Sequence, residues 1–216
     1  DGDFVSAFDA IGWQPTDVVT ANALAVRFNQ AGAPYDNRDV RRGIQLAVDN
    51  AKVLELGIGG LGLPGENHHV CPVHPEYATL PALEVNPDKG REMVVAAGHG
   101  DTEFELTSLD TEWQRNTCDA IAAQMRDAGL NVKRTILPGA TFWNDWLKYP
   151  FSATEWGPRP LGIQIMALAY KSGVAWNESA FANETFDSLL AQGLSIADAD
   201  KRREIMAQMQ RILQEE

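Results

Sequence analysis

Residues 102–137, TEFELTSLDTEWQRNTCDAIAAQMRDAGLNVKRTIL, contain the pattern that sets the architecture of this chain. Phe104 and Leu106 alternate with polar residues, as in a half-buried β-strand. A helical segment follows, ends at Gly129, and places an apolar stripe along Trp113, Thr117, Ile121, Met125 and Ala128. Leu130, Val132 and Ile136 then alternate as a second strand. A strand, a helix and a strand of these lengths predict a βαβ unit, and therefore a parallel strand pair.

On the amino-terminal side, residues 22–29 predict a short strand, and a helix is expected over residues 38–57. Asp36 or Asn37 is suited to cap that helix, and the glycines of residues 57–62 end it. A long proline-containing loop comes next. Asn86 then caps a further helix, which has Pro87 in its first turn and Gly98 just past its end.

On the carboxyl-terminal side, the pattern predicts a short aromatic helix (GATFWNDWLK), a third strand (PFSATEW) and another helix (PLGIQIMALAYKSG). A closing helix pair follows, and Asp198 caps its second member. The whole chain therefore reads as an α/β layer structure, in which helices pack on a small mixed sheet.

The bulk composition is that of an ordinary globular protein. The chain has 216 residues, of which 44% are hydrophobic, so it can bury a sizeable core as one domain. The formal net charge of −12 makes it a poor nucleic-acid binder, because it would repel phosphates. No apolar run reaches the ~18 residues that a membrane span needs.

The stretch ENHHVCPVHPEY, residues 66–77, holds three of the four histidines. His68, His69, Cys71 and His74 are ligand types that zinc or nickel binds. Four ligands within seven residues are unusual, since structural zinc sites draw ligand pairs from two places in the chain. The other reading is a proline-fixed surface loop whose histidines bind no metal, and this is the reading that we expect. A metal site made of the same four residues is the alternative.

Nothing in the sequence indicates catalysis. Cys71 and Cys118 are compatible with one disulfide or with unpaired thiols, and neither lies in a nucleophile signature. The glycine-rich GIGGLGLPG lacks the Lys-Ser/Thr of a phosphate loop and reads as a helix terminator. No pair of carboxylates stands apart from the solvated background. We expect neither enzymatic activity nor a cofactor.

Trp156 and Arg159 are the strongest candidates for ligand contact. Trp156 falls at the end of a predicted strand, and the loop that follows contains Arg159. Ligands of α/β sheets bind beyond strand ends. An indole offers an apolar stacking surface, and a guanidinium fork fits a carboxylate. Trp143 and Trp146, by contrast, are expected to fill the core.

The order of segments resembles the family 5 extracellular solute-binding proteins, the dipeptide, oligopeptide and nickel-type binding proteins of ABC importers. The resemblance rests on LAVRFNQAGAPYDNRDVRRGIQLAVDN, HPEYATLPALEVNPDKGREMVVAAG, the βαβ unit, FSATEWG and the two closing helices. It covers nearly everything from about residue 22 to residue 216. It implies a periplasmic-binding-protein-like lobe with no chemistry of its own.

Family members are normally more than twice as long and have two lobes. The resemblance therefore implies that residues 1–216 form the second lobe alone, a fragment of a longer protein, with residues 1–21 near the hinge. Peptide binders of the family usually carry an Asp shortly after the Trp-Gly, but this chain has Arg159. That exchange favours a solute with an anionic group.

The resemblance implies the substrate-binding component of an ABC importer for a peptide-like or other small polar solute. Its partner would be the permease at the membrane, and its location periplasmic or otherwise outside the cytoplasm. Ser108, Asp110, Trp176 and Asn177 are expected beside Trp156 and Arg159 on the ligand side. Nickel-type chelate binding, a metal-dependent domain using the histidine loop, and a peptidoglycan- or partner-binding module are the alternatives. Half a cleft leaves a solute partly solvated, so this chain alone should not bind with high affinity.

Overall fold

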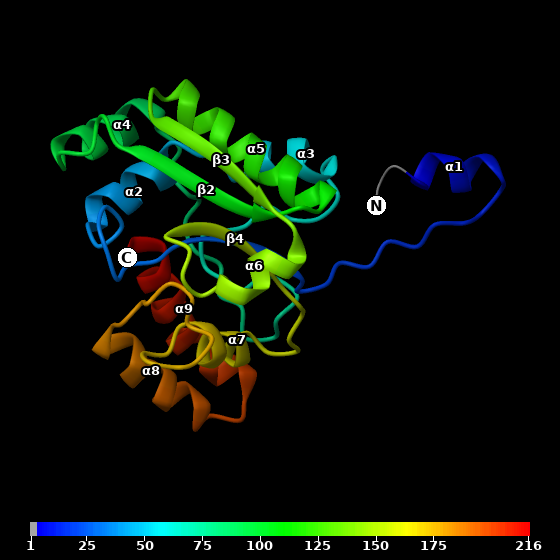
Figure 1. The fold of residues 1–216 in the computed structure, drawn as a ribbon. Coiled ribbons are helices and arrows are strands. Elements are labelled where there is room, and N and C mark those ends of the chain that lie inside the picture. Colours follow the sequence, from blue (N-terminus) through cyan, green and yellow to red (C-terminus); the bar gives the residue numbers. More distant parts are fainter. Residues whose placement is uncertain (1–3) are drawn as a thin grey trace.

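The computed structural model describes residues 4–216. The elements, in chain order, are α1 (Val5–Ala10), β1 (Ala23–Phe28), α2 (Arg38–Leu46), α3 (Asn50–Ile58), α4 (Pro87–Ala96), β2 (Glu103–Leu109), α5 (Glu112–Asp127), β3 (Asn131–Leu137), α6 (Gly139–Asp145), β4 (Phe151–Trp156), α7 (Gly162–Ala169), α8 (Glu184–Leu194) and α9 (Ala199–Glu215). Figure 1 shows α2 to α5 around the sheet, α7 to α9 below it, and residues 4–21 projecting as an arm.

The sheet has the strand order β1-β4-β2-β3. β2 runs parallel to β3 and to β4, and β1 is antiparallel to β4. The predicted βαβ unit and the predicted small mixed sheet are both confirmed. Thr107 lies opposite Ser152 and Ala23 opposite Trp156. The carboxyl ends of β2, β3 and β4 therefore share one edge with the start of β1, and we name this the carboxyl edge.

One face of the sheet is covered by an apolar layer, here called the core face. Phe104 and Leu106 of β2 are fully buried there, together with Met125 and Cys118 of α5 and Val40 of α2. Burying a large apolar side chain contributes about 1.5–3 kcal/mol relative to leaving it exposed, so each of these side chains stabilises the lobe.

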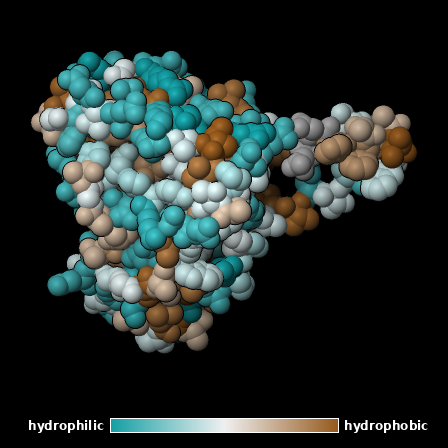
Figure 2. Space-filling model, in the orientation of Figure 1, coloured by the Kyte–Doolittle hydropathy of each residue, from teal (hydrophilic) through white to brown (hydrophobic). Residues whose placement is uncertain are grey.

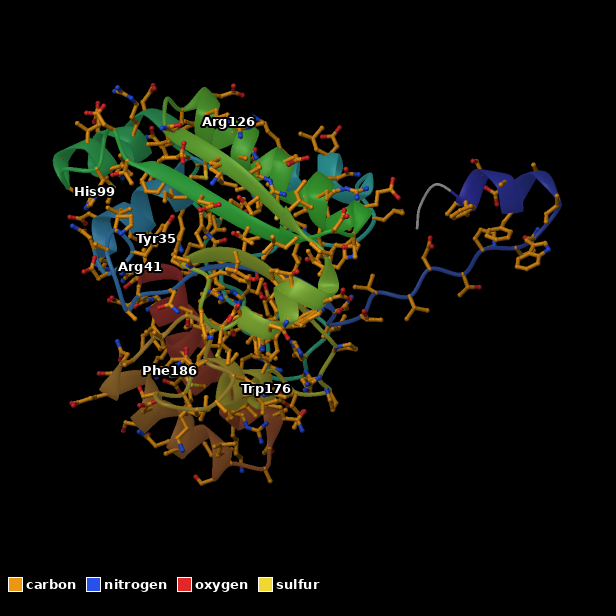
Figure 3. The ribbon with its side chains drawn as sticks, in the orientation of Figure 1. Tyr35, Arg41, His99, Arg126, Trp176 and Phe186 are labelled. Atoms are coloured by element: carbon orange, nitrogen blue, oxygen red, sulfur yellow. The ribbon has the colours of Figure 1, made fainter. Side chains whose placement is uncertain are left out.

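The opposite face differs between its two halves. Over β1 and β4 it meets the half of the molecule that holds α7, α8 and α9, which have an apolar cluster of their own around Met166, Phe186 and Met206. Figure 3 labels Phe186 within this lower, helical half of the molecule. Over β2 and β3, α6 contacts β2, and Glu103 and Glu105 are exposed at the start of β2. A cavity of about 350 Å³ lies beside these two glutamates.

The helix expected over residues 38–57 is two helices in the structure, and the prediction of one continuous helix is wrong. Asp49 has an extended backbone conformation and caps α3, because its side chain accepts a hydrogen bond from the Ala51 N–H. The Asp49 N–H in turn donates to Gln124 of α5 at 3.0 Å. A short acidic side chain that bonds the backbone competes with helix continuation, and this competition ends α2 early.

The predicted helix caps are confirmed, whereas α6 and α7 are shorter than the segments expected at residues 139–148 and 160–173. Asn37 caps α2 and Asn86 caps α4, and the Asp198 side chain accepts hydrogen bonds from two N–H groups of α9. Gly59 ends α3 in the left-handed conformation, as expected for a helix terminator.

Arginines of α2 hold the carboxyl end of α9. Arg38 donates to the Glu215 carbonyl at 2.7 Å, Arg41 donates to the Glu216 carbonyl, and Arg42 bonds the same turn. Cationic groups at a helix carboxyl end complement its dipole. Figure 3 places Arg41 where α2 meets this end of α9, so the contact joins the core-face layer to the helical half.

The arm, residues 4–21, carries exposed apolar side chains. No residue of α1 is buried, and Ile11, Trp13 and Val18 are each more than 60% exposed. Figure 2 shows hydrophobic residues on the projecting arm, whereas much of the visible face of the body is hydrophilic. Within residues 4–216 we find no helix with the length and apolar character required to cross a membrane.

Candidate functional site at the carboxyl edge

Four indole rings form a continuous series, Trp143, Trp146, Trp156 and Trp176, which includes the last residue of β4, Trp156. Trp156 lies edge-on to Trp146 and to Trp176, with ring centroids 6.4 and 6.0 Å apart, and Trp146 lies edge-on to Trp143 at 6.3 Å. We call these four side chains the tryptophan wall. It draws on α6 and the residue just after it, on β4, and on the loop between α7 and α8.

The wall is buried in its middle and open at its ends. Trp156 is 5% exposed, but Trp143 and Trp176 are 46% and 47% exposed. Trp143 was expected to fill the core, and that prediction is wrong: Phe142 beside it is fully buried instead. Trp146 is half-buried. An exposed indole at each end of an ordered aromatic series offers stacking surface to a ligand.

A buried carboxylate fixes the wall from behind. Glu178 accepts hydrogen bonds from the Trp156 indole N–H at 2.8 Å and from the Thr154 hydroxyl at 2.6 Å. The Arg27 Nε atom lies 3.1 Å from the same carboxylate, and the side chains of Arg27 and Glu178 are both more than 90% buried. Burial lowers the pKa of the Arg27 guanidinium, and the negative charge of Glu178 opposes that shift.

Sequence reasoning missed Arg27 and Glu178. The signal for Arg27 was a charged residue inside a strand otherwise made of apolar residues, and Glu178 lies directly after the predicted pair Trp176-Asn177. Neither signal predicts that Arg27 and Glu178 pair with each other. The two residues are brought together only by the pairing of β1 with β4 and by the path of the chain after α7.

Arg159 lies in the loop after β4. Its guanidinium donates to the Gly157 and Pro158 carbonyls at 3.1 and 3.2 Å. Among the described residues, no carboxylate lies within ion-pair distance of Arg159, so its charge is available to an anion. The pKa of the His69 imidazole is lowered to about 3, first by burial and then by the positive charges of His74 and Arg159. The bond to the carbonyl of Gly157, the residue after Trp156, holds the Arg159 guanidinium beside the end of β4. The His69 ring lies edge-on to Trp156 at 5.4 Å.

The structure places the two predicted residues at the end of β2, Ser108 and Asp110, in different surroundings. Asp110 follows β2 at the carboxyl edge, where its side chain pairs with Arg115. Ser108 is fully buried and accepts a hydrogen bond from Arg134 at 2.8 Å. Because Ser108 shares the face of Leu106 and Phe104, it lies on the core face and not with the wall. A ligand role for either residue stays a prediction.

Asn177 organises the loop that carries Trp176. Its side-chain N–H groups donate to the Lys171 and Phe181 carbonyls, and its carbonyl accepts from the Ser179 hydroxyl and the Phe181 N–H. The amide is thus used within the loop itself. A ligand role for Asn177 stays a prediction, but its contacts in the structure are those of a residue that positions its neighbour.

The three histidines of residues 66–77 point to different partners. His68 lies 3.4 Å from Glu66 and 3.2 Å from Gln210, and His69 lies 3.0 Å from the Tyr170 hydroxyl. The His74 ring accepts from the Cys71 N–H at 3.0 Å. Across residues 4–216, no three His, Cys, Asp or Glu side chains converge as a metal would require. The arrangement gives no support to the metal alternative.

Both cysteines are unpaired. Cys71 is half-buried beside His74, and Cys118 is fully buried in the core face. Burial raises the pKa of the Cys118 thiol to about 12, so it stays protonated and unreactive. Of the two readings that the sequence left open, the structure has the unpaired thiols.

Two cavities lie near the predicted residues without including Trp156 or Arg159. The one of about 350 Å³ is lined by Glu103, Glu105 and Thr135 of β2 and β3. The other, of about 270 Å³, is lined by Asn177 and Phe181 in the loop that carries Trp176. The exposed part of the wall consists of its two ends, Trp143 and Trp176.

Comparison with known proteins identifies relatives of this chain. The family described as "Bacterial extracellular solute-binding proteins, family 5 Middle" matches residues 6–177. The chain is 24% identical to Di/tripeptide-binding protein 3 of Pseudomonas aeruginosa over 205 residues, which cover 88% of this chain and 38% of that protein. This chain thus spans well under half the length of that relative.

Solved structures show the same fold. The ABC transporter substrate-binding protein CtaP of Listeria monocytogenes superposes with a TM-score of 0.87 at 15% identity, over 100% of this chain and 46% of that chain. NikZ of Campylobacter jejuni, solved with Ni(L-His), superposes with a TM-score of 0.80 at 15% identity, over 100% of this chain and 48% of that chain. The predicted fold, a periplasmic-binding-protein-like lobe with a small mixed sheet flanked by helices, is confirmed.

Proposed function

Because the chain belongs to the family 5 bacterial extracellular solute-binding proteins, we propose that it is the second lobe of the substrate-binding component of an ABC importer. The solute is peptide-like or another small polar molecule, and Arg159 favours one with an anionic group. The single observation that carries this proposal is the position of the tryptophan wall and Arg159 at the carboxyl edge, where α/β sheets bind ligands.

The ligand-side residues of this proposal are Trp156, Trp176, Arg159 and Asp110. The wall supplies apolar contact, and Arg159 supplies a planar fork for a carboxylate. Because Trp143 and Trp176 are exposed, a solute that contacts them stays partly in water unless a second surface closes over it. Closure of two lobes about a hinge is how binding proteins bury their ligands.

Residues 1–21 fit the hinge-proximal role that the sequence suggested, although residues 1–3 lie outside the described residues. The arm enters β1, and Ala23 of β1 pairs with Trp156 at the carboxyl edge. Its exposed Trp13, Ile11 and Val18 need an apolar surface that the body of this chain does not provide. We assign that surface to the first lobe. The lengths of the relatives support this assignment, because the chain covers 38% of Di/tripeptide-binding protein 3.

The lobe captures a solute and performs no chemistry on it. The arrangement at the carboxyl edge offers stacking and ion pairing, and the carboxylate of Glu178 is saturated by Thr154, Trp156 and Arg27. Capture takes place outside the cytoplasm, in the periplasm or its equivalent. The protein then reaches the membrane through the permease subunits of its transporter.

The proposal is tested in the bacterium that makes the protein. Deleting the gene should leave in the spent medium a solute that the parent strain consumes, and mass spectrometry identifies that solute. Restoring the gene with Arg159→Gln should restore uptake less well than the wild-type gene does. Identical spent media from the parent and the deletion strain would contradict a role in uptake.

A further inference from the structure

We propose that the solute carries a flat aromatic ring, which stacks on the tryptophan wall, and a carboxylate, which Arg159 binds. This inference rests on the proposed function and narrows it to a class of ligand. It assigns the wall, including Trp143 and Trp146, as a ring-binding surface.

The packing of the indoles is the first reason. Three consecutive pairs, Trp143 to Trp146, Trp146 to Trp156 and Trp156 to Trp176, have interplanar angles of 64°, 67° and 65° and centroid distances of 6.0–6.4 Å. Each ring thus meets the next edge to face, which is a favoured geometry for aromatic groups. A further flat ring continues this series at Trp143 or Trp176, where nearly half of each side chain is exposed.

Preorganisation is the second reason. Glu178 fixes the Trp156 indole by a hydrogen bond of 2.8 Å, and the Asn177 side chain ties the loop that holds Trp176. The Gln30 N–H also bonds the Ser179 carbonyl at 2.8 Å, which joins this loop to the end of β1. A wall held in place before binding loses little freedom when a ring stacks on it. A merely exposed apolar patch would need none of these buried polar contacts.

Charge is the third reason. Arg159 lies three residues after Trp156, and its guanidinium contacts only backbone carbonyls among the described residues. The carboxylate of Asp110, which follows β2 at the carboxyl edge, is paired with Arg115. In a chain of net charge −12, an uncommitted cation beside an aromatic surface selects an acid over an amine. Ring and carboxylate together define an aromatic acid, or a peptide or conjugate that ends in one.

The six tryptophans make the test direct, because each gives one indole N–H signal in a ¹H–¹⁵N spectrum of the ¹⁵N-labelled chain. The probes are phenylacetate, cyclohexylacetate, which has the same charge without an aromatic ring, and phenethylamine, which has the ring but the opposite charge. Phenylacetate should shift the Trp143 and Trp176 signals, with an affinity in the millimolar range for a ligand that stays partly in water. Trp13 and Trp113 should stay in place, and Trp13 is the matched control because it is 62% exposed.

We expect cyclohexylacetate and phenethylamine to bind at least five-fold more weakly than phenylacetate. Trp176→Leu should reduce phenylacetate binding at least five-fold, whereas Trp13→Leu should leave it unchanged. Both positions are exposed, so neither variant should unfold the chain. Equal affinity for phenylacetate and cyclohexylacetate would overturn the ring proposal. So would equal shifts at Trp13 and Trp176, or indole signals that move with protein concentration alone, since the wall would then be a contact between copies.

The same titrations distinguish failure of this inference from failure of the proposed function. If both acids bind equally and Arg159→Gln abolishes both, then anion capture at the carboxyl edge stands and only the ring preference falls. If no probe shifts any signal from the wall or from Arg159, both the ring preference and the assignment of the site at this edge fail.

Discussion

The two faces of the β1–β4 half of the sheet differ in the polarity of their buried side chains. On the core face, Val26 and Phe28 of β1 and Phe151 and Ala153 of β4 pack with α2 and α5 in an apolar layer. On the other face, the same strands present Arg27, Thr154 and Trp156 to a buried carboxylate. The core face stabilises the lobe by burying apolar side chains. On the other face, buried polar groups hold a few side chains in fixed positions by hydrogen bonds and an ion pair.

Because the two faces differ in polarity, substitutions on them should differ in their effect on stability. Apolar layers tolerate exchange of similar side chains, since shape and volume decide their energy. A buried ion pair contributes little net stability compared with a well-packed apolar replacement, but removing one partner is costly. The polar face should therefore respond to single substitutions out of proportion to its size.

The largest expected effect is at Glu178. Replacing it with Ala leaves Arg27 buried without its counter-charge and removes the hydrogen-bond acceptor of Trp156, so the free energy of unfolding should fall by about 3–5 kcal/mol. Urea denaturation monitored by circular dichroism measures this change. The double variant Arg27→Met with Glu178→Leu should recover much of the loss. A double variant as unstable as Glu178→Ala would contradict the account of the polar face.

A test of the core face is Gly43→Ala at the contact between α2 and α4. A Cβ atom at Gly43 would lie 2.6 Å from the Gly90 carbonyl oxygen and 2.7 Å from the Val94 side chain. A backbone oxygen cannot rotate away, so the substitution should cost about 1–3 kcal/mol despite the better helix propensity of alanine. Gly32→Ala, where nothing lies within 4 Å, is the matched control and should be near neutral. Equal stability of the two variants in urea would show that α2 and α4 are not packed as described.

The pH dependence of stability tests the burial of His69, whose ring packs against Trp156. Burial lowers the pKa of His69 to about 3, so below its ordinary pKa of 6.5 the unfolded chain binds a proton that the folded chain does not. Stability is complete above about pH 6.5 and is lost as the pH falls, by about 2 kcal/mol from this residue between pH 7 and pH 5. His69→Gln should flatten that part of the curve. His68 and His74, whose pKa values are also lowered by burial, should keep a smaller slope. The same slope with and without His69 would rule out this cause.

The smallest expected effect lies outside both faces. Lys148 and Asp145 form an exposed pair one helical turn apart. Exposed pairs of this kind contribute about 0–1 kcal/mol, so Asp145→Ala should shift the urea midpoint hardly at all. A loss comparable to that at Glu178 would mean that burial does not set the difference between the pairs.

Much of the fold could be predicted from the sequence, because its signals are local. Gly129 ends α5, and Asn86 and Asp198 cap their helices by bonds that reach two or three residues along the chain. The break at Asp49 was missed although its cap bond to the Ala51 N–H is local, because the bond from its own N–H reaches Gln124 in a distant helix. The stripe on α5 was also only partly right. Gln114 and Cys118 are buried, whereas Trp113 and Thr117, which were expected in the stripe, are half-buried, and Thr117 faces Gly57 of α3.

The candidate site could be predicted only in outline. The end of the strand at Trp156 and the position of Arg159 in the following loop could be predicted from the residue types and from the Gly and Pro residues that follow Trp156. The exposure of Trp143 was not, since an aromatic helix next to a strand looks the same whether its rings face the core or solvent. Glu178 and Arg27 were invisible for a different reason: a buried ion pair is a property of two strands and a returning loop, and no spacing along the chain encodes it.

Isothermal titration calorimetry of the 216-residue chain with small acidic and peptide-like solutes tests the central claim most directly. If the carboxyl edge is half of a binding site, most of a solute stays in water, and the affinity should be no tighter than roughly millimolar, about −4 kcal/mol. Micromolar binding of any of these solutes by this chain alone would contradict the claim, because it would require a complete and enclosed site within these residues.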